Sequence, residues 1–361
     1  MHSHNEKELV AKGLKGQRLV IPDMRPIFAH WPSGQNENYQ AMKDIIDERL
    51  AAQSMKEEAR KAFNDMNPAL LAARWWPTAS AKQYQVMVDL IIWFGYWDDL
   101  IESLAPDPAA AEGLRAATKV LVRRSLGLAG PEDVGGGVAI SNPLVRGFES
   151  IAEEVCAVYD EEQRRTLLEH FEQYIDSTRL EAEADRSDRL PSLKRYWQVR
   201  TLTSGMGTLL GFIEFAVEAK LPARLVRSAA YETLWVTTIV INSIVNDLIS
   251  FKKEMKAGSV LSSVAILYHE VDNLDAAVQM SLAHLRILVD EFDRTADALL
   301  SSGSSGSEST PLLDAGEVDA VFRVVDALRM VNTGNLEWSL QSKRYGVSQF
   351  ITAAGQIELV L

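Results

Sequence analysis

The chain has 361 residues, of which 37 are basic and 50 are acidic, and its formal net charge at pH 7 is −13. This balance argues against nucleic acid as a partner, because binding of a nucleic-acid backbone requires clustered lysine and arginine. An anionic small ligand is still compatible, since a bound metal makes an acidic site locally positive. The single cysteine, Cys156, excludes an internal disulfide framework and fits a reducing compartment.

The N-terminal segment 1–38 is expected to be irregular, because Pro22, Pro26 and Pro32 prevent a long helix. It lacks the apolar core of a signal peptide. The longest apolar segment, at 234–245, is interrupted by polar residues and falls short of the roughly 18 apolar residues of a membrane span. We therefore expect a cytoplasmic protein without a membrane span.

Helical periodicity dominates the rest of the chain, and the alternation of apolar and polar residues that is typical of strands is nearly absent. The predicted helices are 39–62, 81–103, 109–126, 145–159, 161–180, 191–219, 223–255, 259–267, 273–299 and 318–340. A glycine-rich loop at 130–142 and a low-complexity flexible loop at 300–311 separate helices without a change of composition. The sequence therefore predicts an all-α fold with a single domain over 1–361.

Three carboxylates, Asp98, Asp99 and Glu102, end the apolar helix predicted at 81–103. At helical spacings of three and four residues, like charges repel by about 0.2–0.5 kcal/mol. A divalent cation would remove this repulsion, and Mg²⁺ is typically bound by one or two carboxylates together with phosphate oxygens. The alternative is an acidic helix end that faces solvent, although the helix dipole disfavours acids at that end.

A second set of oxygen ligands, Asn246, Ser250 and Glu254, lies at every fourth position of a later helix. This spacing places an amide, a hydroxyl and a carboxylate on one helical face, and Lys253 falls near the same face. The alternative is a polar stripe that faces water. Because both oxygen-rich sets follow strongly apolar stretches, together they predict a metal-lined opening to an apolar cavity.

The two motifs resemble those of the microbial class I terpene synthases, the family of bacterial and fungal sesquiterpene cyclases. The segment from Asp98 to Glu102 matches the family's aspartate-rich motif, and the segment from Asn246 to Glu254 matches its second metal motif in full. The resemblance implies a single helical bundle of roughly ten to twelve helices around a central apolar cavity. It also implies an isoprenoid diphosphate substrate and Mg²⁺ as the cofactor, with roughly three ions per site.

Further residues match positions of the same family. Arg200, which precedes Asn246 by 46 residues, matches the diphosphate-sensing arginine, and Arg344 with Tyr345 matches an Arg–Tyr pair near the C-terminus. One departure is Thr203, which stands where many relatives carry an acidic residue. The resemblance implies catalytic roles for Asp98, Arg200, Lys253, Arg344 and Tyr345, of which the last four would bind diphosphate. The implied metal ligands are Asp98, Asp99, Glu102, Asn246, Ser250 and Glu254.

The cavity wall is expected on the same helical rows as the metal motifs and at the break after the sensor arginine. Aromatic faces attract a carbocation, and apolar packing excludes water from it. For each side chain alone, ordinary core packing is the alternative. The expected wall residues are Ile91, Phe94, Gly95, Thr203, Ser204, Trp235, Ile239, Asn242 and Trp338.

The function that follows is Mg²⁺-dependent ionisation and cyclisation of an isoprenoid diphosphate, with farnesyl diphosphate favoured over the geranyl and geranylgeranyl compounds. A chain-elongating prenyl transferase is one alternative, but it usually needs a second aspartate-rich motif where this chain has Asn246, Ser250 and Glu254. A non-catalytic helical binding protein is another. We expect the N-terminal segment to cap the active site, and relatives occur as monomers and homodimers.

Overall fold

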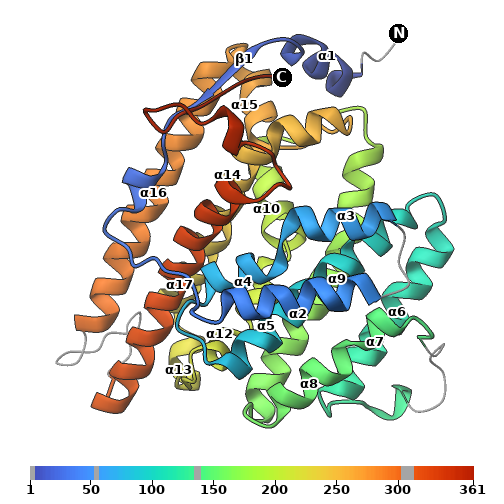
Figure 1. Cartoon of the computed structure of the whole chain (residues 1–361), viewed down its shortest axis with the longest axis vertical. Helices are drawn as coiled ribbons and strands as arrows, with labels where there is room; N and C mark the ends of the chain where they lie inside the picture. The colour runs from blue at the N-terminus through green and yellow to red at the C-terminus, as the bar shows by residue number, and fades with distance from the viewer. Residues whose placement is uncertain (1–4, 53–56, 134–139, 302–312) are drawn as a thin grey trace.

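The computed structural model describes residues 5–52, 57–133, 140–301 and 313–361, and Figure 1 shows their arrangement. The helices of the first half are α1 (Glu6–Leu14), α2 (Tyr39–Ala52), α3 (Glu57–Met66), α4 (Pro68–Trp75), α5 (Ala81–Ser103), α6 (Pro108–Ser125), α7 (Pro143–Arg146), α8 (Phe148–Cys156) and α9 (Glu161–Arg186). Those of the second half are α10 (Leu193–Thr203), α11 (Met206–Leu210), α12 (Ile213–Ala216), α13 (Ala223–Val226), α14 (Ala229–Lys256), α15 (Ser263–Val271), α16 (Leu274–Ser301) and α17 (Ala315–Gln341). The remaining elements are the strands β1 (Arg18–Ile21) and β2 (Ile357–Val360) and the short 3₁₀ helices η1 (Arg25–Phe28), η2 (Pro131–Asp133) and η4 (Ser348–Phe350). The predicted all-α fold class is confirmed.

The helices that carry the predicted motifs have well-defined beginnings. The Ser80 side chain caps α5 by accepting a hydrogen bond from the backbone N–H of Gln83, and Ser228 caps α14 in the same way. A reciprocal capping box between Asp160 and Gln163 begins α9. These local signals fix where each helix starts and therefore which residues reach its far end.

Helix α14 is the central helix of the bundle and packs against α10, α16 and α17. Among the described residues it is the one helix long and apolar enough to cross a membrane, yet 83% of its most apolar window is buried inside the fold. Such burial is expected of the core helix of a bundle, because a helix that is hydrophobic on most sides needs neighbours around it.

The two ends of the chain are joined by a small antiparallel sheet, in which β1 pairs with β2 (Figure 1). Leu19 faces Leu359 and Ile21 faces Ile357 in the register, and all four side chains are buried. The prediction that the whole segment 1–38 is irregular is therefore wrong for α1 and β1. A four-residue strand leaves almost no periodic signal, and its partner comes from the opposite end of the chain.

Several predicted helices are interrupted in the structure. The helix predicted at 191–219 is divided into α10, α11 and α12 at Gly205 and Gly211, and the start of the one predicted at 223–255 is the separate turn α13. The region predicted as one helix at 39–62 contains α2 and the beginning of α3. Most of the flexible loop predicted at 300–311, and the centre of the loop at 130–142, lie outside the described residues.

Candidate active site

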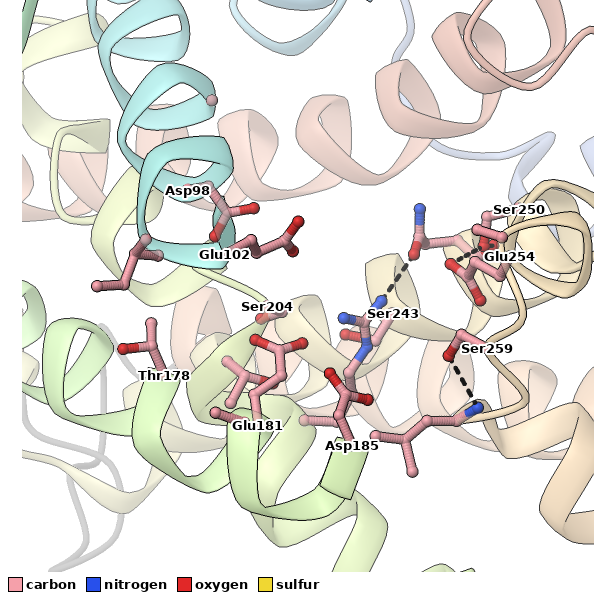
Figure 2. Close-up of a pocket in the computed structure, with 18 of the residues that line it drawn as sticks. Asp98, Glu102, Thr178, Glu181, Asp185, Ser204, Ser243, Ser250, Glu254 and Ser259 are labelled. Atoms are coloured by element: carbon pink, nitrogen blue, oxygen red, sulfur yellow. Dashed lines mark hydrogen bonds between the residues drawn. The ribbon is translucent and has the colours of Figure 1, made fainter. Parts of the chain in front are cut away.

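A cavity of about 990 Å³ lies inside the bundle, between α5, α9, α10, α14 and α17. Figure 2 shows its polar end, where side chains from α5, α9 and α14 point toward one another. Asp98 and Glu102 extend from α5, while Ser250 and Glu254 approach from the opposite side on α14. The tertiary structure thus brings the two predicted metal motifs to opposite sides of one opening.

On α5, Asp98 is half-buried and accepts a hydrogen bond from the hydroxyl of Tyr174 on α9. Burial raises the pKa of Asp98, whereas the Tyr174 hydrogen bond acts in the opposite direction. Burial and the negative charge of Asp98 raise the pKa of Glu102 to about 7. Asp99 is exposed and does not line the cavity, and the positive charges nearest to it are Arg344 and Lys253.

On α14, the predicted ligands Asn246, Ser250 and Glu254 all line the cavity. The Ser250 hydroxyl lies 2.6 Å from Oε1 of Glu254 and 2.7 Å from the carbonyl oxygen of Asn246, either of which accepts its proton. The Asn246 side chain accepts a hydrogen bond from Nη2 of Arg200 at 2.7 Å and donates one to the Tyr345 hydroxyl at 2.9 Å. Asn246 therefore connects the second motif to two of the predicted diphosphate-binding residues.

Asp247, the residue next to Asn246, is not one of the predicted metal ligands and instead holds neighbouring side chains in place. Its buried carboxylate accepts hydrogen bonds from the Tyr196 hydroxyl at 2.7 Å and from Ser263, through the backbone N–H at 2.9 Å and the hydroxyl at 2.6 Å. It also forms an ion pair with Arg200 at 3.4 Å. Asp247 thus anchors the Arg200 guanidinium, whose Nε has no hydrogen-bond partner among the described residues.

Lys253, Arg344 and Tyr345 also line the cavity, near the carboxylates. Burial, followed by the positive charge of Arg344, lowers the pKa of Lys253. The Tyr345 ring packs edge-on against Trp338, with ring centroids 5.5 Å apart. The structure therefore places the four predicted diphosphate-binding residues around one end of the cavity.

Helix α9 supplies site residues that the sequence reasoning missed. Tyr174 contacts Asp98, while Glu181 and Asp185 point into the cavity opposite the metal motifs (Figure 2). Burial and the charge of Asp98 raise the pKa of Glu181 to about 7. Glu181 follows Tyr174 by seven residues and Asp185 follows Glu181 by four, so the three side chains share one helical face. This spacing is the sequence signal that could have identified them.

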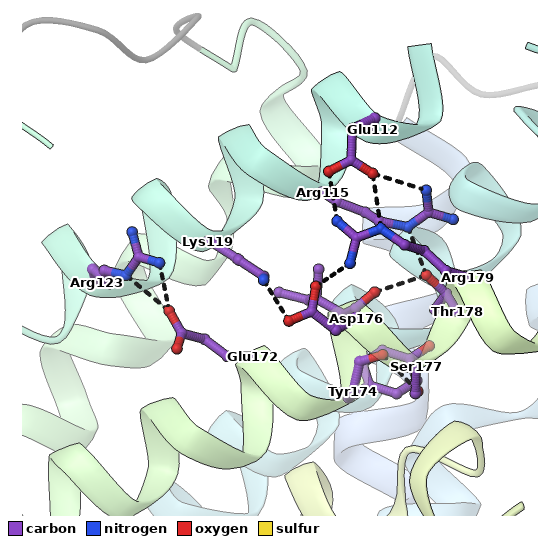
Figure 3. Close-up of polar contacts among 11 residues, drawn as sticks. Glu112, Arg115, Lys119, Arg123, Glu172, Tyr174, Asp176, Ser177, Thr178 and Arg179 are labelled. Carbon is purple, nitrogen blue, oxygen red and sulfur yellow. Dashed lines mark hydrogen bonds and ion pairs between the residues drawn. The ribbon is translucent and has the colours of Figure 1, made fainter. Parts of the chain in front are cut away.

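The outer face of α9 is fastened to α6 by a row of ion pairs (Figure 3). Lys119 pairs with Asp176 at 2.6 Å, and Arg123 pairs with Glu172 at 2.6 Å. On the cavity side, where both residues belong to the lining, the buried Arg115 donates a hydrogen bond from Nε to the Thr178 hydroxyl at 2.9 Å. These contacts fix the rotation of α9 and so hold its inner face toward the cavity.

The predicted wall residues fall into two groups. Those that line the cavity are Ile91, Phe94, Gly95, Thr203, Ser204, Asn242 and Trp338. Trp235 and Ile239 are absent from the lining, and Trp235 stacks on His170 with ring centroids 4.9 Å apart. Further lining side chains that the sequence reasoning missed are Met66, Leu71, Trp75, Met206, Leu209 and Asn335.

The N-terminal helix α1 reaches the cavity through Lys7. Its Nζ donates hydrogen bonds to the carbonyl oxygens of Ala184 at 2.6 Å and Asp185 at 3.1 Å, at the C-terminal end of α9. Unpaired carbonyls at that end of a helix attract cations. The predicted cap thus has a contact at the edge of the cavity.

The oxygen donors are of the type that hard cations prefer. Among the described residues, no three His, Cys, Asp or Glu side chains are close enough together to hold a metal. The donors are instead divided between the two sides of the opening and include an amide and a hydroxyl. This arrangement fits Mg²⁺, which keeps several water or phosphate ligands and takes few from the protein.

Comparisons with known proteins identify the family of the chain. Residues 89–291 match the family model described as terpene synthase family 2, C-terminal metal binding. The chain is 27% identical to the sesquiterpene cyclase hepA of Aspergillus oryzae, over 99% of this chain and 97% of the relative. It is 29% identical to the pristinol synthase of Streptomyces pristinaespiralis, over 83% of this chain and 78% of the relative.

The fold is also found in solved structures. The crystal structure of the linalool/nerolidol synthase from Streptomyces clavuligerus superposes with a TM-score of 0.72 at 20% identity, over 85% of this chain and 98% of that chain. The matched family model covers both metal motifs, which the structure places at the two sides of one cavity. The chain therefore belongs to the microbial class I terpene synthases and is a terpene cyclase.

Proposed function

We propose that the enzyme uses Mg²⁺ to ionise farnesyl diphosphate and cyclises the product to a sesquiterpene, with release of diphosphate. The observation that carries this proposal is the division of one cavity into an oxygen- and cation-rich opening and a largely apolar interior. The similarity to hepA, a protein named as a sesquiterpene cyclase, supports a C15 substrate.

The residues that would hold Mg²⁺ are Asp98 on one side of the opening and Asn246, Ser250 and Glu254 on the other, with Glu102 beside Asp98. Asp99 lies outside the lining, so we propose that it pairs with Arg344 and Lys253. Bound Mg²⁺ would supply Lewis-acid stabilisation of the negative charge that develops on the leaving diphosphate.

The cationic side chains of the opening would bind the diphosphate oxygens. Arg200 and Arg344 offer planar, forked donors, and Lys253 offers a point charge. In the structure Arg200 and Tyr345 are both bonded to the Asn246 side chain. Diphosphate binding would therefore rearrange these three residues together, which couples substrate recognition to assembly of the metal site.

The interior would stabilise the carbocation and exclude water. Phe94, Trp75 and Trp338 present aromatic rings to the cavity, and such faces attract cations through their quadrupoles. The indole N–H of Trp338 donates a hydrogen bond to the carbonyl oxygen of Met66 at 2.7 Å, which fixes the orientation of the ring. A rigid wall of this kind selects among the conformations of a flexible substrate.

The test is incubation of purified protein with geranyl, farnesyl and geranylgeranyl diphosphate, with and without Mg²⁺, followed by gas chromatography–mass spectrometry. We expect a cyclic C15 product only from farnesyl diphosphate with metal, and loss of this product in Asp98→Ala and Asn246→Ala. A matched control is Asp319→Ala, which removes an exposed carboxylate paired with Arg323 on α17.

Other outcomes would change the assignment. Turnover of only the C10 or C20 substrate would overturn the choice of farnesyl diphosphate and keep the cyclase. A longer prenyl diphosphate, formed with added isopentenyl diphosphate, would contradict cyclisation and support chain elongation. Equal product without metal would overturn the role of Mg²⁺.

A further inference from the structure

An amide seam crosses the inner wall of the cavity between α14 and α17. It consists of Asn242 on α14 and of Asn332 and Asn335 on α17, whose side chains are between 1% and 7% exposed. Asn242 and Asn335 line the cavity, whereas Asn332 lies behind them. Three buried amides are unusual beside aromatic and aliphatic side chains, because buried amides require hydrogen-bond partners.

The orientation of the Asn242 amide is fixed by its neighbours. Its Nδ2 donates to the carbonyl oxygen of Thr238 at 3.0 Å and to Oδ1 of Asn332 at 2.6 Å. Asn332 is itself fixed, because its Nδ2 donates to the carbonyl oxygen of Leu328 at 3.0 Å. Exchanging the oxygen and nitrogen of Asn242 would place an acceptor against two acceptors, so its Oδ1 has to stay where it is.

That oxygen has no hydrogen-bond donor among the described residues, although it is fully buried. Asn335 also lines the cavity, and its Nδ2 reaches the backbone carbonyl of Asn242, rather than the side-chain oxygen, at 3.5 Å, the outer limit of a hydrogen bond. Asn335 therefore has donor capacity to spare beside an acceptor that lacks a donor. A water molecule admitted between them, by a small displacement of the buried amide oxygen toward the cavity, would satisfy both groups, as buried waters commonly do.

We propose that Asn242 and Asn335 bind a water molecule that attacks the carbocation, so that the enzyme forms a terpene alcohol. This inference rests on the proposed cyclisation of an isoprenoid diphosphate and specifies its product class. The water donates one proton to Oδ1 of Asn242 and accepts a hydrogen bond from Nδ2 of Asn335. One of its lone pairs stays free to face the cavity.

The step balances without a further reagent. The oxygen of the water forms a bond to the cationic carbon, which gives a protonated alcohol. The surplus proton passes to the released diphosphate, which is the strongest base that the reaction itself provides. The neutral amide of Asn242 only orients the water, because an amide oxygen is too weak a base to keep the proton.

The position of the seam suits this role. Asn242 precedes the predicted metal ligand Asn246 by one helical turn on α14, so the water would sit just below the diphosphate. Ser243 also lines the cavity and donates its hydroxyl to the carbonyl oxygen of Ile239 at 2.8 Å. Its lone pairs are thereby available as a second acceptor for the water.

The experiment is the Mg²⁺-dependent reaction of the intact enzyme in H₂¹⁸O, with the products analysed by gas chromatography–mass spectrometry. We expect the main product to be an alcohol that is two mass units heavier than in ordinary water, and absent without enzyme. Asn242→Leu and Asn335→Leu should each lower the ratio of alcohol to hydrocarbon at least tenfold.

The matched control is Ser339→Ala, which removes a buried hydroxyl on α17 one turn beyond Asn335 and outside the cavity lining. This hydroxyl has no hydrogen-bond partner in the part of the chain that the structure describes. The Ser339→Ala variant should keep the wild-type ratio of alcohol to hydrocarbon. Thermal unfolding of each variant identifies misfolding, and the isotope experiment on the wild type needs no variant.

The possible failures are distinguishable. A wild-type product that is only hydrocarbon, without ¹⁸O, overturns the water site and leaves the cyclase intact. An alcohol whose ratio to hydrocarbon is unchanged in both leucine variants also overturns the assignment to these residues. Absence of any metal-dependent product overturns the proposed function and this inference with it.

Discussion

Tyr174 lies outside both predicted metal motifs but contacts one of them. Its buried hydroxyl donates to Asp98, and its ring packs on Phe94 with centroids 4.5 Å apart. Replacing a side chain that orients a metal ligand typically lowers metal affinity or activity by about 10–100-fold. If Asp98 binds metal as we propose, Tyr174 is expected to act as a positioning residue through Asp98.

The variant Tyr174→Phe should lower kcat/KM by about 10–100-fold and raise the Mg²⁺ concentration needed for half-maximal rate, because Asp98 loses its orienting partner. Steady-state kinetics at varied Mg²⁺ measures both effects. The control is Tyr84→Phe, which removes a buried hydroxyl on α5 that donates to the carbonyl oxygen of Ala69 away from the cavity. An equal metal requirement in the two variants would contradict the positioning role.

Asp247 acts at the same scale, but on stability. Its carboxylate is the buried counter-ion of Arg200 and accepts hydrogen bonds from Tyr196 and Ser263. Removing one partner of a buried ion pair leaves an uncompensated charge and costs about 3–5 kcal/mol. Asp247→Ala should lower the free energy of unfolding by about this amount, as measured by urea denaturation.

The comparison for Asp247→Ala is Asp319→Ala, whose carboxylate is 67% exposed and paired with Arg323. Surface ion pairs of this kind are worth about 0–1 kcal/mol. Equal losses of unfolding free energy in the two variants would contradict the role of Asp247 as the buried counter-ion of Arg200.

At the scale of elements, the break between α10 and α11 is decided by a single glycine. Gly205 has φ +69°, a left-handed conformation that favours glycine. An added Cβ would lie 2.0 Å from Cζ of Phe94 on α5, far inside contact distance. The missing side chain thus permits Phe94 to pack directly on the break that follows Arg200.

Gly205→Ala should destabilise the protein by about 2 kcal/mol or more, from left-handed strain and displacement of Phe94. It should also change the product distribution, because Phe94 lines the cavity. Gly113→Ala in α6 is the matched control, since among the described residues no atom beyond its own helical turn lies within 4 Å of an added Cβ. Alanine also favours a helix over glycine by about 1 kcal/mol. Thermal unfolding should therefore shift in opposite directions for the two variants.

A second substitution checks the mechanism of that effect. Phe94→Leu in the Gly205→Ala background removes the ring atoms that the new Cβ meets, so part of the lost stability should return. If the double variant unfolds at the temperature expected from adding the two single effects, the contact with Phe94 is not the cause.

At the scale of the whole molecule, the cavity collects carboxylates whose charges are mutually unfavourable. Burial, and then the charge of Asp98, raises the pKa values of Glu102 and Glu181 to about 7 from an ordinary value of 4.5. At these two positions the folded protein therefore binds more protons than the unfolded chain between about pH 4.5 and 7. The contribution of these two groups to the free energy of unfolding is therefore greatest below about pH 4.5 and is lost as the pH rises through about 7.

Without metal, the thermal unfolding temperature of the wild type should thus fall between pH 5 and 7.5 more steeply than that of a Glu102→Gln, Glu181→Gln double variant. Added Mg²⁺ with inorganic diphosphate should stabilise the wild type most at the higher pH, because metal ligands bind deprotonated. Scanning fluorimetry over this pH range measures both. Parallel curves for wild type and variant would contradict the assignment to these carboxylates.

The sequence by itself determined what depends on local spacing. Apolar residues at helical period predicted an all-α fold, and oxygen donors three or four residues apart predicted which side chains of α5 and α14 share a face. These inferences hold because a helix converts spacing along the chain into position on a face, whatever surrounds it. The resemblance to terpene synthases rested on the same residues, and the comparisons support that family.

The tertiary structure decided how the faces are rotated and which other elements meet them. It placed Tyr174 and Glu181 of α9 near α5, stacked the partly buried Trp235 on His170 outside the cavity lining, and joined β1 to β2. It also left the side-chain oxygen of Asn242, which contacts Asn335 through its backbone, without a donor from any described residue. Such contacts join residues far apart in the chain, and side-chain packing sets them, which spacing within one helix does not encode.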